Sequence, residues 1–170
     1  MRVPLMIFLG ATLLGCGQKT ENPATPPTVF EASSTGGHSH EKGTMLLADA
    51  GRYHALLTAH LSKDGNELDI FFETAGKTPQ AVALPLATLK ASVQIRTVDG
   101  GLKEVEFVPA SADERPKGEA AGTCSHFVAK VPWLGPDIEH RVIVRVVLDG
   151  KDEEIRWNSF IPRKYAHHTD

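Results

Sequence analysis

The sequence is poor in the residues that several classes of protein require. Its 170 residues include only two cysteines, too few for a disulfide-stapled scaffold. Its 18 lysine and arginine residues are outnumbered by 21 aspartate and glutamate residues, so nucleic acid is not an expected partner. Hydrophobic residues make up 41% and charged residues 23%, which is ordinary for a folded domain. At this length we expect one domain with tails.

Common catalytic motifs are also absent. The sequence has no Gly-x-Ser-x-Gly, His-Glu-x-x-His or Gly-x-Gly-x-x-Gly motif and no phosphate-binding loop. We therefore expect a protein that is not an enzyme. A hydrolase or redox site that distant residues bring together remains an alternative, because unrelated folds assemble such sites by convergence.

Only one long uncharged hydrophobic run is present, and it lies at the amino end. Residues 3–15 follow the positive charge of Arg2, as in the apolar core of a secretory signal peptide. The run is shorter than the about 20 residues that span a bilayer. It ends in Leu13-Leu14-Gly15-Cys16, which resembles the lipobox of bacterial lipoprotein signal peptides.

The lipobox resemblance implies how the chain is processed. Residues 1–15 would be a signal peptide cleaved after Gly15, and Cys16 would carry a diacylglyceryl group with acyl chains such as palmitate. Two or more acyl chains hold a protein stably on a membrane. Gly17, where an aspartate would indicate the inner membrane, favours the periplasmic side of the outer membrane. An ordinary signal peptide with a chance cysteine is the alternative.

Residues 16–43 follow as a flexible linker. They are rich in proline, threonine, serine and glycine and contain too few large apolar side chains to form a core. The chain therefore predicts a signal peptide, a lipidated cysteine with its linker, a folded domain over 44–162 and a short tail over 163–170.

Alternation of apolar and polar residues predicts β-strands throughout the folded domain. Asp-Gly pairs at 64–65, 99–100 and 149–150 supply the positive φ of tight hairpin turns. We expect an Ig-like β-sandwich of about seven or eight antiparallel strands, with a small barrel as the alternative. The expected strands lie near residues 44–62, 67–73, 93–96, 104–107, 126–131, 141–148 and 154–157.

Two further segments carry structural predictions. Residues 86–91 are the one place where a short helix fits the pattern. Residues 109–122 contain no large apolar side chain, and their length and composition favour a disordered, solvent-facing loop.

Histidines near both ends of the domain suggest metal binding. Imidazole binds Zn²⁺ and Cu²⁺ well, and paired histidines are a compositional sign of such binding. If the first and last strands lie close together, the two pairs can form one site, and solvated tails with incidental histidines are the alternative. The candidate ligands are His38, His40, His54, His167 and His168.

Cys124 and His126 form a second candidate pair. Two residues apart on one strand, they are expected to share a face and to lie close enough to hold one metal. No methionine follows Cys124, which argues against a blue-copper site. With Cys16 lipidated, Cys124 is expected to be a free thiol, and a buried one.

The start of the domain has a loose resemblance of its own. His38-x-His40, Gly43-Thr44 and Tyr53-His54-Ala55 look like the opening of small periplasmic β-domains associated with heavy-metal efflux adaptor proteins. This resemblance implies a metal-related role without fixing a ligand. We therefore expect a lipid-anchored binding domain of the cell envelope that captures Zn²⁺ or Cu²⁺. The alternative is a structural or interaction module with a protein partner in the envelope.

Overall fold

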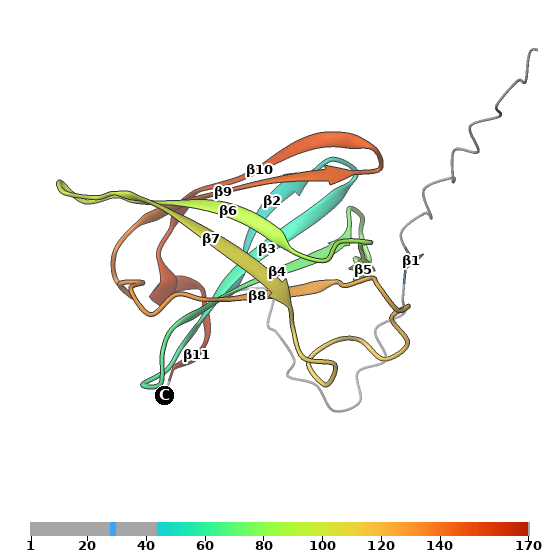
Figure 1. Ribbon diagram of the computed structural model, residues 1–170, viewed down its shortest axis with the longest axis horizontal. Coiled ribbons are helices and arrows are strands. Elements are labelled where there is room, and N and C mark those ends of the chain that lie inside the picture. Colours follow the sequence, from blue (N-terminus) through green and yellow to red (C-terminus); the bar gives the residue numbers. More distant parts are fainter. Residues whose placement is uncertain (1–27, 30–43, 170) are drawn as a thin grey trace, which may run out of the picture.

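A computed structural model describes residues 28–29 and 44–169, and within these the fold is all-β, as predicted. Figure 1 shows the strands, and a short 3-10 helix, η2, lies between the last two of them. The elements are β1 (Thr28–Val29), β2 (Leu46–Ala50), β3 (Tyr53–Leu61), β4 (Glu67–Thr74), β5 (Val82–Ala83), β6 (Leu89–Ile95), β7 (Leu102–Pro109), β8 (His126–Lys130), β9 (His140–Leu148), β10 (Lys151–Phe160), η2 (Pro162–Tyr165) and β11 (Ala166–Thr169). No helix among these residues is long and apolar enough to cross a membrane.

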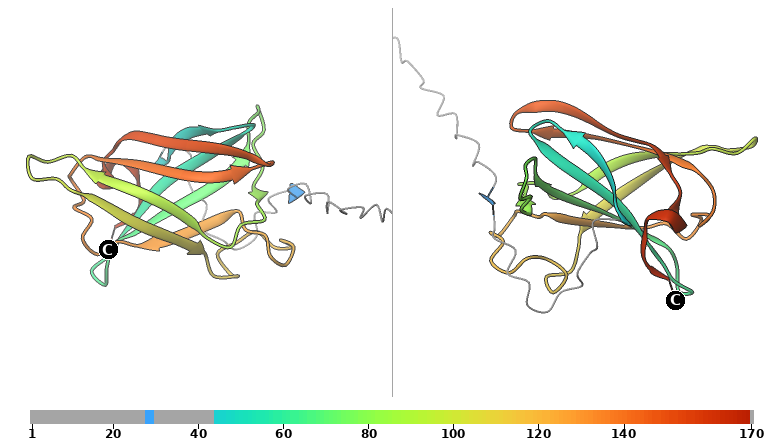
Figure 2. Two further views of the ribbon diagram at one scale, coloured as in Figure 1. Left: turned by 45° about the horizontal axis from the view of Figure 1, so that its top comes forward. Right: turned by 180° about the vertical axis from the view of Figure 1, so that it is seen from behind.

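Two layers of strands face each other across the core (Figure 2). One layer has the order β10-β9-β6-β7, and the other has the order β8-β4-β3, with β2 and β11 along the outer edge of β3. Strand β7 joins them, because it pairs with β6 along most of its length and with β8 at Val108 and Pro109. On the opposite side, the indole nitrogen of Trp157 in β10 donates to the main-chain oxygen of Leu46, 2.8 Å away. The result is a nearly closed antiparallel sheet with features of both the sandwich and the barrel.

The period-two alternation of the sequence defines the core. In β3 the odd-numbered residues from Tyr53 to Leu61 point inward, and in β4 Leu68, Ile70 and Phe72 do the same. Burying a large apolar side chain contributes about 1.5–3 kcal/mol, so these rows hold the layers together. The largest fully buried hydrophobic side chains are Trp157, Phe72, Phe107, Phe127 and Phe160.

The prediction of one strand over 44–62 was wrong. The segment is a hairpin in which β2 pairs antiparallel with β3, from Leu46 opposite Leu57 to Ala50 opposite Tyr53. Gly51 makes the turn with a φ of 63°, in the left-handed region that favours glycine. The sequence concealed this turn because alternation continues on both sides of Gly51 and no Asp-Gly or Asn-Gly pair marks it.

Two other expectations need correction. The short helix considered over 86–91 is absent, and β6 starts at Leu89 within that stretch. The loop over 109–122 is ordered by polar contacts that are described below. Strand β1 lies within the expected linker and pairs with β5, and the expected tail contains β11 and most of η2.

The carboxyl-terminal strand determines where several candidate residues lie. After η2, strand β11 runs parallel to β3 along its second half, and Figure 1 shows the two side by side at one end of the domain. Arg163 in η2 forms a two-point ion pair with Asp137, at 2.6 and 2.9 Å, and the Tyr165 ring stacks on Phe160. These contacts hold the end of the chain against the folded domain.

Candidate functional site

The pairing of β11 with β3 brings together two imidazoles on the surface. The ring centroids of His167 and His60 lie 5.6 Å apart with an angle of 48° between the ring planes. His60 is half-buried on β3, and His167 is half-buried on β11. These two imidazole rings lie side by side, and His167 is one of the predicted ligands.

A buried hydroxyl lies next to this pair. Thr58, two residues before His60 on β3, is fully buried, and its Oγ1 lies 3.2 Å from Nδ1 of His167. The same hydroxyl donates a hydrogen bond to the main-chain oxygen of Tyr165. Thr58 thus connects the imidazole of His167 to the backbone just before β11.

His54 lies at the other end of β3. Six residues of strand at about 3.3 Å each separate it from His60 by about 20 Å, so one metal ion cannot bind both. Its neighbours are two carboxylates: its Nε2 lies 4.0 Å from Asp49 and its Nδ1 lies 3.9 Å from Glu73. The structure therefore does not bring His54 and His167 together.

The remaining terminal candidates are only partly described. Cys16, His38 and His40 lie outside the described residues. The backbone of His168 pairs with that of His60 in the parallel ladder, while its side chain lies outside what the structure describes. Among the described side chains, no three histidine, cysteine, aspartate or glutamate residues are grouped so that they could hold a metal ion.

The second predicted pair, Cys124 and His126, does not form a shared site. Cys124 is a free thiol, 1% exposed, within the hydrophobic core, as expected, and its Sγ donates to the main-chain oxygen of His126 at 2.8 Å. Burial is the main cause that raises the pKa of this thiol above its ordinary value. A protonated thiol in an apolar core is a poor metal ligand, because the thiolate is the form that binds.

His126 is occupied elsewhere. Its Nε2 lies 2.9 Å from Oδ1 of Asp69, and its Nδ1 lies 3.3 Å from the main-chain oxygen of Glu114. Its ring also stacks on Phe71 at 4.0 Å. Both nitrogens of the buried ring therefore face oxygen acceptors, and the prediction that His126 and Cys124 share a metal has no geometric support.

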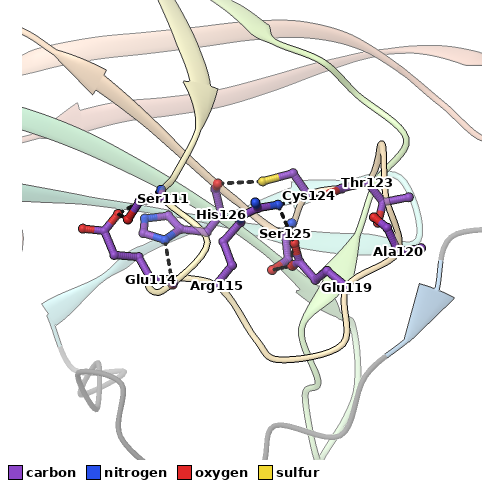
Figure 3. Close-up of polar contacts among 9 residues, drawn as sticks. All are labelled: Ser111, Glu114, Arg115, Glu119, Ala120, Thr123, Cys124, Ser125 and His126. Carbon is purple, nitrogen blue, oxygen red and sulfur yellow. Dashed lines mark hydrogen bonds and ion pairs between the residues drawn. The ribbon is translucent and has the colours of Figure 1, made fainter.

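The loop over 109–122 covers His126 and is held by a carboxylate (Figure 3). The side chain of Glu119 is 5% exposed and accepts hydrogen bonds from the amide and the hydroxyl of Ser125, the amide at 3.0 Å. Its other oxygen lies 3.2 Å from Arg115, which also donates to the main-chain oxygen of Thr123. These contacts replace the apolar core that the loop lacks, and composition alone could not reveal them.

The hairpin between β6 and β7 extends beyond the body of the domain (Figure 1). At its end Val98 is fully exposed, and Leu102 is 64% exposed. Arg96 fixes the base of the hairpin through an ion pair with Glu139 at 2.9 Å. Connecting segments that project from a rigid scaffold often carry binding residues.

Comparison with protein-family models, with curated proteins and with solved structures finds no similar protein. A function for this protein is therefore inferred from its residues and their geometry.

Proposed function

We propose that this protein is a lipid-anchored binding domain of the cell envelope that captures a divalent transition metal through histidines at the ends of its domain. The observation that carries the proposal is the position of His167 on an ordered strand, with its ring 5.6 Å from that of His60. Histidines on an ordered strand lose less conformational entropy on binding than histidines in a solvated tail.

The proposed lipid anchor would hold the proposed metal site in the periplasm. The lipobox at Leu13-Leu14-Gly15-Cys16 implies lipidation of Cys16 and favours the periplasmic side of the outer membrane. A domain fixed there would meet metal ions that enter the periplasm. Zn²⁺ and Cu²⁺ are the proposed ions because both accept imidazole nitrogen.

The test is calorimetric titration of the untagged full-length chain, in detergent, with Zn²⁺ and Cu²⁺ at neutral pH. We expect saturable binding that is lost below about pH 5.5, because protonated imidazole cannot ligate. The comparison variant replaces His38, His40, His167 and His168 by alanine. Equal metal affinity of the two proteins would contradict the proposal.

A second candidate function is recognition of another envelope protein. It is favoured by one observation, the exposed Val98 and Leu102 on the projecting β6–β7 hairpin. Site-specific photo-crosslinking from position 98 in intact cells tests it. The interaction function predicts one discrete crosslinked product that Leu102→Asp abolishes, and a chain that forms no product would remove its support.

A further inference from the structure

An irregularity in the β11–β3 ladder determines where His167 points. Ala166 pairs with Ala59 and His168 pairs with His60, so His167 is an additional residue on β11 between two pairs that are consecutive on β3. Bulges of this kind change the direction of one side chain. Here the side chain of His167 meets Thr58 and His60, which lie two residues apart and hence on one face of β3.

The spacing of the two rings suits a shared ion. Imidazole nitrogens bind transition metals at about 2.0–2.1 Å, so two rings on one ion have centroids about 4.5–6.4 Å apart, depending on the angle at the metal. The centroids of His60 and His167 are 5.6 Å apart, within this range. Both residues come from strands, which position ligands more precisely than loops do.

Thr58 assigns the tautomer of His167. A threonine hydroxyl has one proton to donate, and in Thr58 that proton goes to the main-chain oxygen of Tyr165. The contact of 3.2 Å with His167 must then have Nδ1–H as donor and Oγ1 as acceptor. In the neutral ring this leaves the lone pair on Nε2, the arrangement that orienting hydrogen bonds impose on metal-binding histidines.

We propose that His60 and His167 bind one divalent transition-metal ion of the imidazole-preferring class, Cu²⁺ first among them, and that Thr58 is a positioning residue for His167. This inference rests on the proposed function and adds His60 and Thr58 to its site. Cu²⁺ forms the strongest complexes of the divalent first-row metals with such ligands. Ca²⁺ and Mg²⁺ prefer oxygen ligands and are not expected to bind here.

Single substitutions in the untagged full-length chain test the two ligands. Cu²⁺ affinity is measured by competition with a chelator, and electron paramagnetic resonance reports the coordinating nitrogens. We expect His60→Gln and His167→Gln each to weaken Cu²⁺ binding about 10–100-fold and to remove a nitrogen signal. His54→Gln is the matched control, because it alters a half-buried histidine on the same strand and should leave affinity unchanged.

The outcomes separate this inference from the proposed function. If the unaltered chain binds no Cu²⁺, the proposed function fails and the inference fails with it. If the unaltered chain binds Cu²⁺ and His60→Gln and His167→Gln match it, while a His38→Gln/His40→Gln double variant loses binding, the inference alone is overturned. Should His60→Gln fail to fold, His60→Thr replaces it, because a β-branched residue suits a strand.

Thr58 is tested by rescue. Thr58→Val keeps the shape of the side chain but removes the hydroxyl, and we expect Cu²⁺ affinity to fall about tenfold or more. Thr58→Ser restores the hydroxyl and should restore most of the affinity, which a purely structural role would not require. If serine and valine weaken Cu²⁺ binding equally, the positioning role is contradicted.

Discussion

The histidines of this domain have different surroundings, although their residue type suggests the same role for each. Of the described histidines, His126 is buried against Asp69, His140 is fully buried, and His54 lies between two carboxylates. Only His60 and His167 lie next to each other. Residue type thus identifies many possible ligands, and the contacts of each ring reduce them to one pair.

We expect the burial of His140 to make the domain less stable at acidic pH. His140 is 0% exposed, and burial is the main cause that lowers its pKa below the ordinary 6.5. The unfolded chain therefore takes up a proton at a pH where the folded chain does not, so this histidine costs stability as pH falls below about 6.5. We expect His140→Gln to lose less stability than the unaltered protein between pH 7.5 and 5.5, measured by urea unfolding. An equal loss in both proteins would contradict this role.

Cys124 should be chemically inert in the folded protein. Its thiol is 1% exposed, and burial raises its pKa, so little thiolate forms at neutral pH. We expect Ellman's reagent to react with Cys124 many times more slowly in the native protein than in urea. Rapid stoichiometric labelling of the native protein would show that the thiol is accessible.

The alternation of apolar and polar residues predicted some strands of this domain and missed others. Alternation predicted β4, β8, β9 and most of β3 because each has one face in the core. It missed the β2–β3 turn at Gly51, which lacks the usual pair of turn residues. It also missed β11, whose sequence Ala-His-His-Thr has no apolar alternation.

The candidate site was predicted only in part for the same reason. Its position next to His168 makes His167 a candidate ligand, but nothing near His60 in the sequence does the same, because six residues of strand separate it from His54. The pairing of His60 with His167 depends on a parallel edge contact between segments more than 100 residues apart. No local signal in the sequence encodes such a contact.

The loop over 109–122 should depend on Glu119 for its order. Its carboxylate is nearly buried and satisfies both Ser125 and Arg115. Glu119→Gln would leave Arg115 without its charge partner, and we expect a loss of about 1–3 kcal/mol in the free energy of unfolding. Hydrogen exchange should also become faster in this loop. Lys117→Gln, an exposed change in the same loop, is the control, and a similar loss in both variants would contradict the role of Glu119.

The domain as a whole is a nearly closed sheet whose last segment completes one edge. Strand β2 pairs with the first half of β3 and β11 with the second half, along the same outer edge. Segments from both ends of the folded region therefore lie beside one strand. This architecture supports the expectation that the two ends of the domain share a surface. It places the carboxyl-terminal histidines on that surface through β11.

Removal of the carboxyl-terminal segment tests whether it belongs to the domain. A chain that ends at residue 162 loses β11, the Arg163–Asp137 ion pair and the stacking of Tyr165 on Phe160. We expect its free energy of unfolding to fall by at least about 1 kcal/mol. A chain that ends at residue 169 should match the full chain. Equal stability of all three would mean that the segment is not part of the folded unit.

The measurement that tests the central claim most directly is the Cu²⁺ affinity of His60→Gln compared with that of His54→Gln. Both variants lose one half-buried histidine from β3, and only His60 lies beside His167. A metal site at the β3–β11 edge predicts weaker binding in His60→Gln alone. Equal affinities in the two variants would contradict it.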